Sequence, residues 1–288
     1  IVDGVLAITK VDTVEPSRVR DVREAVATLL APTRLASSPI VEVSGTTGAN
    51  LDSLRAALVA LRDRVVARKE LGVRGPRRLA IDRAFDVRGR GAVVTGTLRG
   101  GPLRSGERLR LLPARLEIRV RGLQVHHAPV PEAEPGRVAA NLVGVELKML
   151  TRGNVLTTDT WIEPTDRLLV ALAAPAPLAY GGRSLGTSWP PRDGSVLRLH
   201  IGTASLDARV VRRGREGLVL PDGRLAALLR LAGSIATFAG DRGVLREPGQ
   251  GGLVAGVVVL DPRPPIGASR RRVTPERVAT LATEVAEG

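Results

Sequence analysis

The chain has 288 residues, enough for two or three domains of ordinary size. It carries 43 lysines and arginines against 29 acidic residues, a net charge of +14, and nearly all of the basic residues are arginine. This excess attracts polyanions and predicts a nucleic-acid partner. Cysteine is absent, which excludes disulfides, thiol catalysis and cysteine-based metal sites, and no apolar run is long enough to span a membrane. These absences are compatible with a cytoplasmic location, which we expect.

Residues 1–70 alternate between strand and helix patterns, as an α/β domain does. Residues 4–8 and 39–43 predict short buried strands, and each is followed by apolar residues at helical spacing. The first helix is predicted to begin at Pro16 and to end before Pro32, and Asn50 is predicted to cap the second helix. This order of elements is half of a doubly wound domain.

The pattern changes after residue 70, where short alternating runs are separated by glycine and proline turns. Their spacing predicts one antiparallel barrel over 71–162 and a second over 163–262. Because aromatic residues make up only 2% of the chain, the cores must be aliphatic. The clearest strand patterns lie at 77–81, 92–95, 107–111, 118–121, 137–141, 195–201, 208–211 and 256–260.

Residues 263–288 are predicted to form a linker and a short C-terminal helix that begins at Thr274-Pro275 and leads toward a further domain. The expected fold class is therefore multidomain, α/β followed by all-β. A partial Rossmann-like domain precedes two antiparallel β-barrels and the final helix.

Two short motifs follow the two predicted strands of the α/β segment. The first, Thr9-Lys10-Val11-Asp12, has the residues that a guanine-reading loop needs. A carboxylate accepts hydrogen bonds from the ring N–H and exocyclic amine of guanine, while a lysine stem covers the ring face, so Asp12 would select guanine over adenine. The second loop would reach the guanine oxygen through backbone N–H groups, and its predicted residues are Ser44, Gly45 and Thr46.

The motifs that bind phosphate are absent from these 288 residues. A P-loop needs Gly-Lys-Ser or Gly-Lys-Thr, and no lysine here follows a glycine. The segment 86–89 matches the Asp-x-x-Gly switch pattern in spelling, but it lies after the guanine motif and inside a predicted barrel. We therefore expect the chain neither to bind GTP well nor to hydrolyse it, and we predict no catalytic residue.

The region 78–97 resembles the second domain of the selenocysteine-specific translation elongation factors. Its Gly-x-Val-x-x-Gly-Thr core, residues 91–97, is shared with elongation factor Tu and initiation factors, whereas Ile-Asp-Arg-Ala-Phe at 81–85 is typical of the selenocysteine branch. Residues 200–204, 240–242 and 256–262 resemble the third domain of the same factor. The resemblance covers nearly the whole chain, and it implies two barrels of the elongation factor Tu type.

The resemblance also implies a pocket for the aminoacyl group, formed by Asp82, Arg83 and Arg137. A selenol is largely ionised at neutral pH and the hydroxyl of serine is not, so two guanidinium groups would stabilise a selenolate and gain little from serine. Asp82 is expected to hold Arg83 in place. The alternative is an ordinary surface ion pair, because adjacent strand residues normally point to opposite faces.

The implied function is translation elongation, with GTP as cofactor and Mg²⁺ beside it in the complete protein. The implied partners are selenocysteyl-tRNA, the ribosome and an mRNA hairpin that a winged-helix C-terminal domain outside this chain would recognise. The chain would then be a fragment of that factor. Two alternatives stay open: another translation-type GTPase, a group whose members need not carry the pocket residues, and a degenerate, non-enzymatic relative whose barrels bind tRNA. No metal site is predicted at His126-His127, which has no third ligand nearby.

Overall fold

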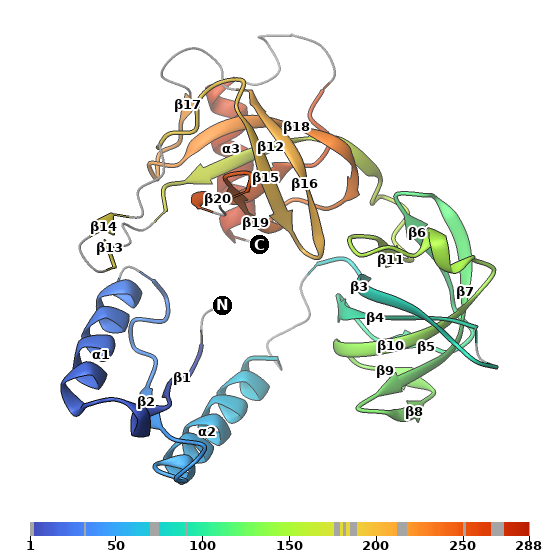
Figure 1. Ribbon diagram of the computed structural model, residues 1–288. Coiled ribbons are helices and arrows are strands. Elements are labelled where there is room, and N and C mark those ends of the chain that lie inside the picture. Colours follow the sequence, from blue (N-terminus) through green and yellow to red (C-terminus); the bar gives the residue numbers. More distant parts are fainter. Residues whose placement is uncertain are drawn as a thin grey trace. The chain divides into compact units, whose positions relative to one another are not determined.

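The computed structural model describes residues 3–31, 33–69, 75–89, 91–175, 179–180, 183–184, 189–211, 218–249, 252–265 and 274–287. They fall into two compact units: Ile1–Val73 with Ala176–Gly186, and Arg74–Pro175 with Thr187–Gly288. Figure 1 shows the α/β elements of the first unit and the two barrels of the second. Among the described residues, no helix has the length and apolar character needed to cross a membrane.

The first unit has the predicted alternation of strands and helices. Strands β1 (Leu6–Thr9) and β2 (Ile40–Val43) pair in parallel, with Thr9 opposite Val43. The helical segments are η1 (Val11–Thr13), α1 (Pro16–Leu30) and α2 (Leu51–Lys69). Helix α1 begins at proline as expected. Among the described residues this sheet has two strands, which gives the helices little surface to pack on, and Leu58 of α2 remains 49% exposed.

Asn50 does not cap α2 in the predicted way. Its backbone is left-handed, with φ of 57°, and its side-chain amide donates to the carbonyl oxygen of Glu42 at 2.9 Å. The side chain therefore ties the start of α2 to strand β2 rather than accepting a hydrogen bond from the first turn of the helix.

The first barrel is a closed ring of six antiparallel strands in the order β10-β4-β3-β11-β6-β7, closed by the pairing of β10 with β7. Strand β8 extends the sheet beside β7, and β5 pairs with β9. The bounds are β3 (Arg78–Val87), β4 (Gly91–Arg99), β5 (Leu103–Arg104), β6 (Arg108–Leu112), β7 (Leu116–Val125), β8 (Ala128–Val130), β9 (Glu132–Ala133), β10 (Gly136–Val143), η2 (Leu147–Met149) and β11 (Val155–Thr157).

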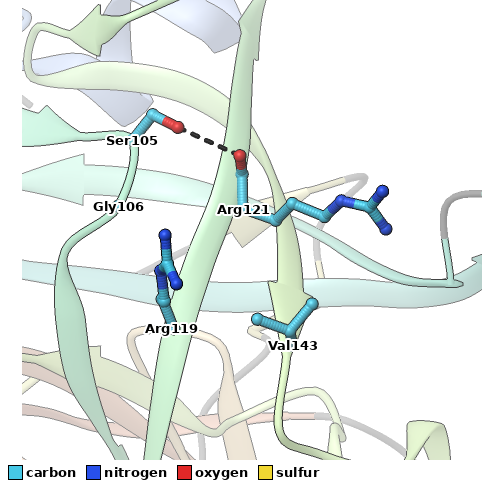
Figure 2. Close-up of a pocket in the computed structure, with 5 residues that line it drawn as sticks. All are labelled: Ser105, Gly106, Arg119, Arg121 and Val143. Carbon is cyan, nitrogen blue, oxygen red and sulfur yellow. Dashed lines mark hydrogen bonds between the residues drawn. The ribbon is translucent and has the colours of Figure 1, made fainter.

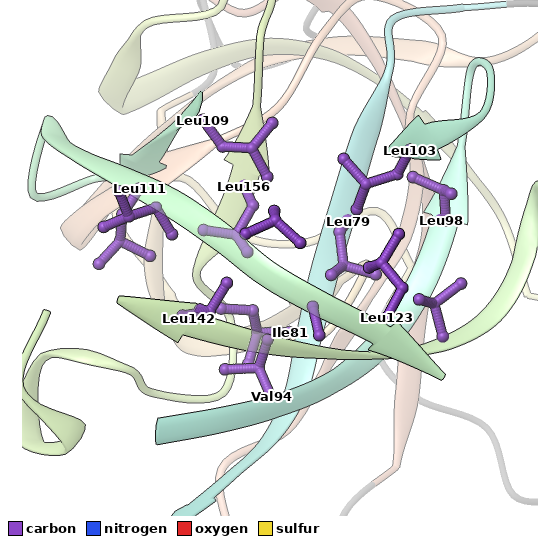
Figure 3. Packing of buried hydrophobic residues seen from close by; sticks show 14 of the residues in the cluster. Leu79, Ile81, Val94, Leu98, Leu103, Leu109, Leu111, Leu123, Leu142 and Leu156 are labelled. Carbon is purple, nitrogen blue, oxygen red and sulfur yellow. The ribbon is translucent and has the colours of Figure 1, made fainter. Parts of the chain in front are cut away.

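The interior of this barrel is aliphatic, as the composition requires. Figure 3 shows leucines from several strands meeting inside the ring, among them Leu79, Leu111 and Leu156, each 1% exposed or less. Burial of this apolar surface is the main force that closes the ring.

The second barrel is a ring in the order β12-β20-β19-β15-β16-β18, closed by the pairing of β12 with β18, and β17 lies beside β18. Its bounds are β12 (Pro164–Ala173), β15 (Val196–Ile201), β16 (Ala204–Val211), β17 (Leu218–Val219), β18 (Leu225–Ala236), β19 (Arg242–Arg246) and β20 (Leu253–Asp261). A separate small pair is formed by β13 (Ala179–Tyr180) and β14 (Arg183–Ser184). The expected two-barrel fold class is confirmed.

The final helix, α3 (Pro275–Glu287), packs on the outside of the second barrel. Val278 and Ala282 of α3 join a small apolar cluster with Leu169 and Leu260 of the barrel wall. The Thr274 hydroxyl accepts the backbone N–H of Arg277 at 3.3 Å, which is the predicted cap.

A buried ion pair joins the two barrels within the second unit. Arg78, the first residue of β3, donates to both carboxylate oxygens of Asp241 at 2.7 and 2.5 Å, and the two side chains are only 11% and 14% exposed. Asp241 also accepts from the hydroxyl of Thr237 at 2.7 Å, and the Arg78 guanidinium lies 4.2 Å from the ring centre of Phe238. Both charges are therefore paired and hydrogen-bonded, as buried charges require.

Replacing Arg78 with Ala should lower the free energy of unfolding by about 3 kcal/mol, because Asp241 would remain buried without its counter-charge. The measurement is urea denaturation of the chain at neutral pH, followed by circular dichroism. Arg108→Ala is the matched control, since its partner Glu117 is on the surface and the two side chains are 77% and 63% exposed. We expect a loss below about 1 kcal/mol for the control. Equal losses for the two variants would contradict a stabilising role for the ion pair between Arg78 and Asp241.

Candidate functional site

The two predicted guanine loops lie at the same edge of the parallel sheet. Thr9 ends β1 and is opposite Val43, which ends β2, so the loops at 10–13 and 44–47 leave neighbouring strands side by side. This is the carboxyl edge of the strands, where open α/β sheets bind their ligands. The structure thus brings the two sets of predicted residues together.

Local hydrogen bonds hold both loops. Lys10 has a left-handed backbone, with φ of 61°, and the Thr13 hydroxyl donates to its carbonyl oxygen at 2.8 Å. In the second loop the buried Ser44 accepts the backbone N–H of Thr47 on its hydroxyl at 3.0 Å. The side chains of Lys10 and Asp12 are exposed beside this edge. Guanine binding by these residues remains a prediction.

A β-bulge sets the geometry of the second candidate site, on the outer wall of the first barrel. In the pairing of β3 with β4, Ile81 is opposite Gly96 and Arg83 is opposite Thr95, so Asp82 is the extra residue. Strict alternation from the buried Ile81 would turn Arg83 into the core, but the extra residue leaves it exposed. The bulge therefore lets the side chains of Asp82 and Arg83 both face away from the core. In a regular strand, the side chains of two adjacent residues point to opposite faces.

Gly96 permits the close approach of the two strands at this bulge. A Cβ on residue 96 would lie 2.2 Å from the carbonyl oxygen of Ala80, which is a backbone atom that has no room to move. Only glycine fits, which gives a physical reason for the second glycine in the motif at 91–97.

Asp82, Thr95 and Arg137 form a hydrogen-bonded cluster across three neighbouring strands. Both nitrogens at the tip of Arg137 donate to the Asp82 carboxylate, one of them to Oδ1 at 3.0 Å, and the Thr95 hydroxyl donates to the same Oδ1 at 2.9 Å. Burial alone would raise the pKa of Asp82. The hydrogen bonds from Arg137 and Thr95, together with the charges of Arg137 and Arg83, outweigh it and hold that pKa below its usual range.

The expected partnership of Asp82 with Arg83 is replaced by a partnership with Arg137. Within the described residues, the Arg83 side chain makes no hydrogen bond or ion pair, although its charge acts on Asp82. The reason is the register: Arg137 on β10 reaches across β4 to the bulge, whereas the backbone turns Arg83 outward. The cluster therefore holds one neutralised guanidinium and one without a bonded partner.

A recess of about 890 Å³ opens beside this cluster. Its wall includes Arg137 and Thr95 of the cluster, and Phe85, which follows Arg83 by two residues on the same strand. Arg83 is not among the residues that line the recess. The recess is large enough for an amino-acid side chain together with a nucleoside.

Several residues of the recess were not predicted from the sequence. They come from β7, from β10 and from the turn between β7 and β8, and they include Arg121, Gln124, His126, His127 and Asn141. His126 and His127 both have left-handed backbones, with φ of 50° and 69°, which turns this hairpin sharply at the mouth of the recess. A two-histidine turn with no glycine is the signal in the sequence that could have drawn attention to them.

Asp82→Asn should remove a stabilising contribution that is present at neutral pH and absent in acid. Because the folded-state pKa is lowered, the contribution is complete above the ordinary carboxyl pKa of about 3.9 and disappears as pH falls through the lowered value. We expect about 1 kcal/mol at neutral pH, since the Arg137 side chain is 54% exposed. Urea denaturation of both proteins across this pH range measures it. A difference between the two proteins that persists in acid would refute the assignment.

Comparisons with known proteins identify relatives of this chain. Residues 91–157 match the family model of elongation factor Tu domain 2. The selenocysteine-specific elongation factor of Desulfomicrobium baculatum is 31% identical over 97% of this chain, and that of Escherichia coli is 32% identical over 96%. The chain spans 42% and 41% of the lengths of these two relatives.

Solved structures show the same fold. A bacterial selenocysteine-specific elongation factor, EF-Sec, matches with a TM-score of 0.77 at 22% identity, over 100% of this chain and 44% of its own. The factor SelB of Methanococcus maripaludis, solved with the GTP analogue GppNHp, matches with a TM-score of 0.71 at 22% identity, over 88% of this chain and 58% of its own. Over nearly its whole length, the chain thus belongs to the family of the selenocysteine-specific elongation factors.

Proposed function

We propose that this chain supplies the two tRNA-binding barrels and the guanine-reading edge of a factor that delivers selenocysteyl-tRNA to the ribosome. The observation that carries the proposal is the cluster of Asp82, Thr95 and Arg137 with Arg83 beside it, at the edge of a recess in the first barrel. The two relatives that match nearly the whole of this chain are named selenocysteine-specific elongation factors.

The charges of the cluster suit a selenolate. Asp82 neutralises Arg137, so the three ionised side chains carry one net positive charge, which belongs to Arg83. A single anionic selenium beside the cluster would receive charge-assisted hydrogen bonds from Arg83 and stay close to the exposed part of Arg137. The neutral hydroxyl of a seryl group would leave the Arg83 charge uncompensated. Discrimination would therefore depend on the ionisation of the amino acid more than on its size.

The second barrel offers a basic surface for the acceptor arm of the tRNA. Arg198 on β15 is directly opposite Arg246 on β19, and Arg198 forms an ion pair with Asp207 on β16 at 3.2 Å, so these three side chains carry one net positive charge. His200 follows on the same strand, and its pKa is lowered by burial and by the charges of Arg246, Arg198 and Arg152. A neutral His200 and the arginines around it suit a phosphate backbone.

The guanine base of GTP fits the residues of this chain, but the triphosphate does not. The loops at 9–12 and 44–46 lie together at one sheet edge, as the base requires. The 288 residues contain no P-loop, and the described residues include no group of acidic or histidine side chains that could hold a metal. Mg²⁺ and the phosphates would thus be bound by parts of the factor outside this sequence, and we derive no hydrolysis step for this chain.

The ribosome, an mRNA hairpin and a cytoplasmic location belong to the same proposal. They rest on the family to which the chain belongs, because the relatives are more than twice as long as the part that it matches.

Arg83→Gln should lower the affinity for selenocysteyl-tRNA about tenfold or more, because it removes charge-assisted hydrogen bonds to selenium. The affinity for seryl-tRNA with the same tRNA body should change less than about twofold, since a hydroxyl offers no charge to pair. The measurement is protection of the ester bond from hydrolysis as a function of the concentration of the chain.

The control is Arg108→Gln, which removes an arginine that is paired with Glu117 on the surface of the same barrel. It should leave both affinities unchanged. If the wild-type chain protects seryl-tRNA and selenocysteyl-tRNA equally, the proposed specificity for selenocysteine is wrong. The alternative of a general tRNA-binding relative would then be favoured.

A further inference from the structure

A second recess, of about 520 Å³, lies on the outer wall of the first barrel and shares one lining residue with the recess described above. It is lined by Ser105, Gly106, Arg119, Arg121 and Val143, which Figure 2 shows. Arg121 contributes to both recesses. The two hollows therefore follow one another along strand β7, at its seam with β10, where Val143 is opposite Arg119.

Arg119 and Arg121 are the uncompensated arginines of this wall. Within the described residues, neither side chain forms an ion pair. The four neighbouring arginines of β5, β6 and the turn before β7 each bind a glutamate: Arg104 binds Glu132, Arg108 binds Glu117, and Arg110 and Arg115 share Glu163. Glu117, two residues before Arg119, is thus already occupied. The neighbouring arginines are thus paired within the protein, whereas Arg119 and Arg121 are available to an external anion.

The second recess offers a ligand positive charge, because its donors other than the two guanidinium groups are already used within the protein. The Ser105 hydroxyl donates to the carbonyl oxygen of Arg121 at 3.0 Å, and the N–H of Gly106 donates to the carbonyl oxygen of Val120 at 2.8 Å. Neither group has a hydrogen left for a ligand. The remaining donors are the two guanidinium groups, two residues apart on one strand face and so about 6.6 Å apart at their Cα atoms. In Figure 2 the Arg119 side chain runs toward Gly106, and that of Arg121 extends away from it.

We propose that this second recess binds phosphates in the RNA backbone, on the segment next to the aminoacylated end that occupies the first recess. The assignment rests on the proposed function for the identity of that end. Arginine forks match phosphate oxygens, the wall carries no unpaired acid, and Val143 is its only apolar side chain, which leaves no anchor for a protein partner. The shared Arg121 makes the path continuous, so an RNA strand that leaves the first recess along β7 passes Arg121 and then Arg119.

The test uses the whole chain and the double substitution Arg119→Gln with Arg121→Gln. The probe is a fluorescent single-stranded RNA 12-mer without an amino acid, and its affinity is measured by anisotropy at several KCl concentrations. Each phosphate contact on a single strand contributes about 0.7 to the slope of log K against log salt, so we expect the slope to fall by about 1.4 and the affinity at low salt to fall about tenfold or more.

The matched control is Arg104→Gln with Arg115→Gln, which removes the same two charges from arginines that are bound to glutamate. It should leave the slope unchanged. If the two double variants behave alike, only net charge matters and the inference is overturned. It is also overturned if polyglutamate of equal length competes with the RNA as well as unlabelled RNA does.

A single substitution separates this inference from the proposed function. In the ester-protection assay, Arg119→Gln alone, which changes no residue of the first recess, should keep the preference for selenocysteyl-tRNA over seryl-tRNA while binding both more weakly. A wild-type chain with no such preference would refute the proposed specificity, but the RNA 12-mer would still decide whether the second recess binds phosphate.

Discussion

The ion pair between Arg78 and Asp241 is the constraint on which the geometry of the second unit depends. In the part of the chain that the structure describes, no strand of one barrel pairs with a strand of the other, so side chains make the contact between them. Here one guanidinium and one carboxylate, both nearly buried, are held by a threonine hydroxyl and an aromatic face. Arg78 is also the first residue of the strand that carries Ile81 into the core and Asp82 to the surface. The ion pair and the candidate aminoacyl site are thus built on the same ten-residue strand.

A local irregularity in a regular barrel decides which side chains of this strand face outward. The bulge at Asp82 changes which residues face outward, and Gly96 allows the opposing backbone to come close enough for the bulge to form. Without the extra residue, a charged side chain would be forced toward an aliphatic core, at a cost of several kcal/mol. The position of the bulge is therefore strongly determined, even though the bonds within the cluster are partly open to solvent.

The sequence predicted the helices and strands well, but it did not predict which side chains bind one another. Alternating apolar residues located strands of both barrels, and the proline at 16 located the first residue of a helix. Strand periodicity contains no information on a bulge, so Asp82 was paired with its neighbour Arg83 instead of with Arg137, which is 55 residues away. Arg121 was missed because its place beside Asn141 and Arg137 depends on the closure of the ring by β7 and β10. Asn50 was wrong as a cap because its backbone is left-handed, whereas a capping residue has an extended backbone, and its side-chain amide donates to the carbonyl oxygen of Glu42 instead.

The single net charge at the cluster of Asp82, Arg83 and Arg137 has a consequence for fidelity. A site that selects an ionised side chain cannot use charge to distinguish a thiolate from a selenolate. The frequency with which it binds cysteine would therefore depend on the fraction of the thiol that is ionised. A free thiol has a pKa of about 8.5, and only about 3% of it is ionised at pH 7, which limits rejection of cysteine by charge to about thirtyfold there. That margin shrinks by about tenfold for each unit of pH while the thiol remains mostly protonated. Accuracy against serine would not decline in this way, because the hydroxyl stays neutral throughout.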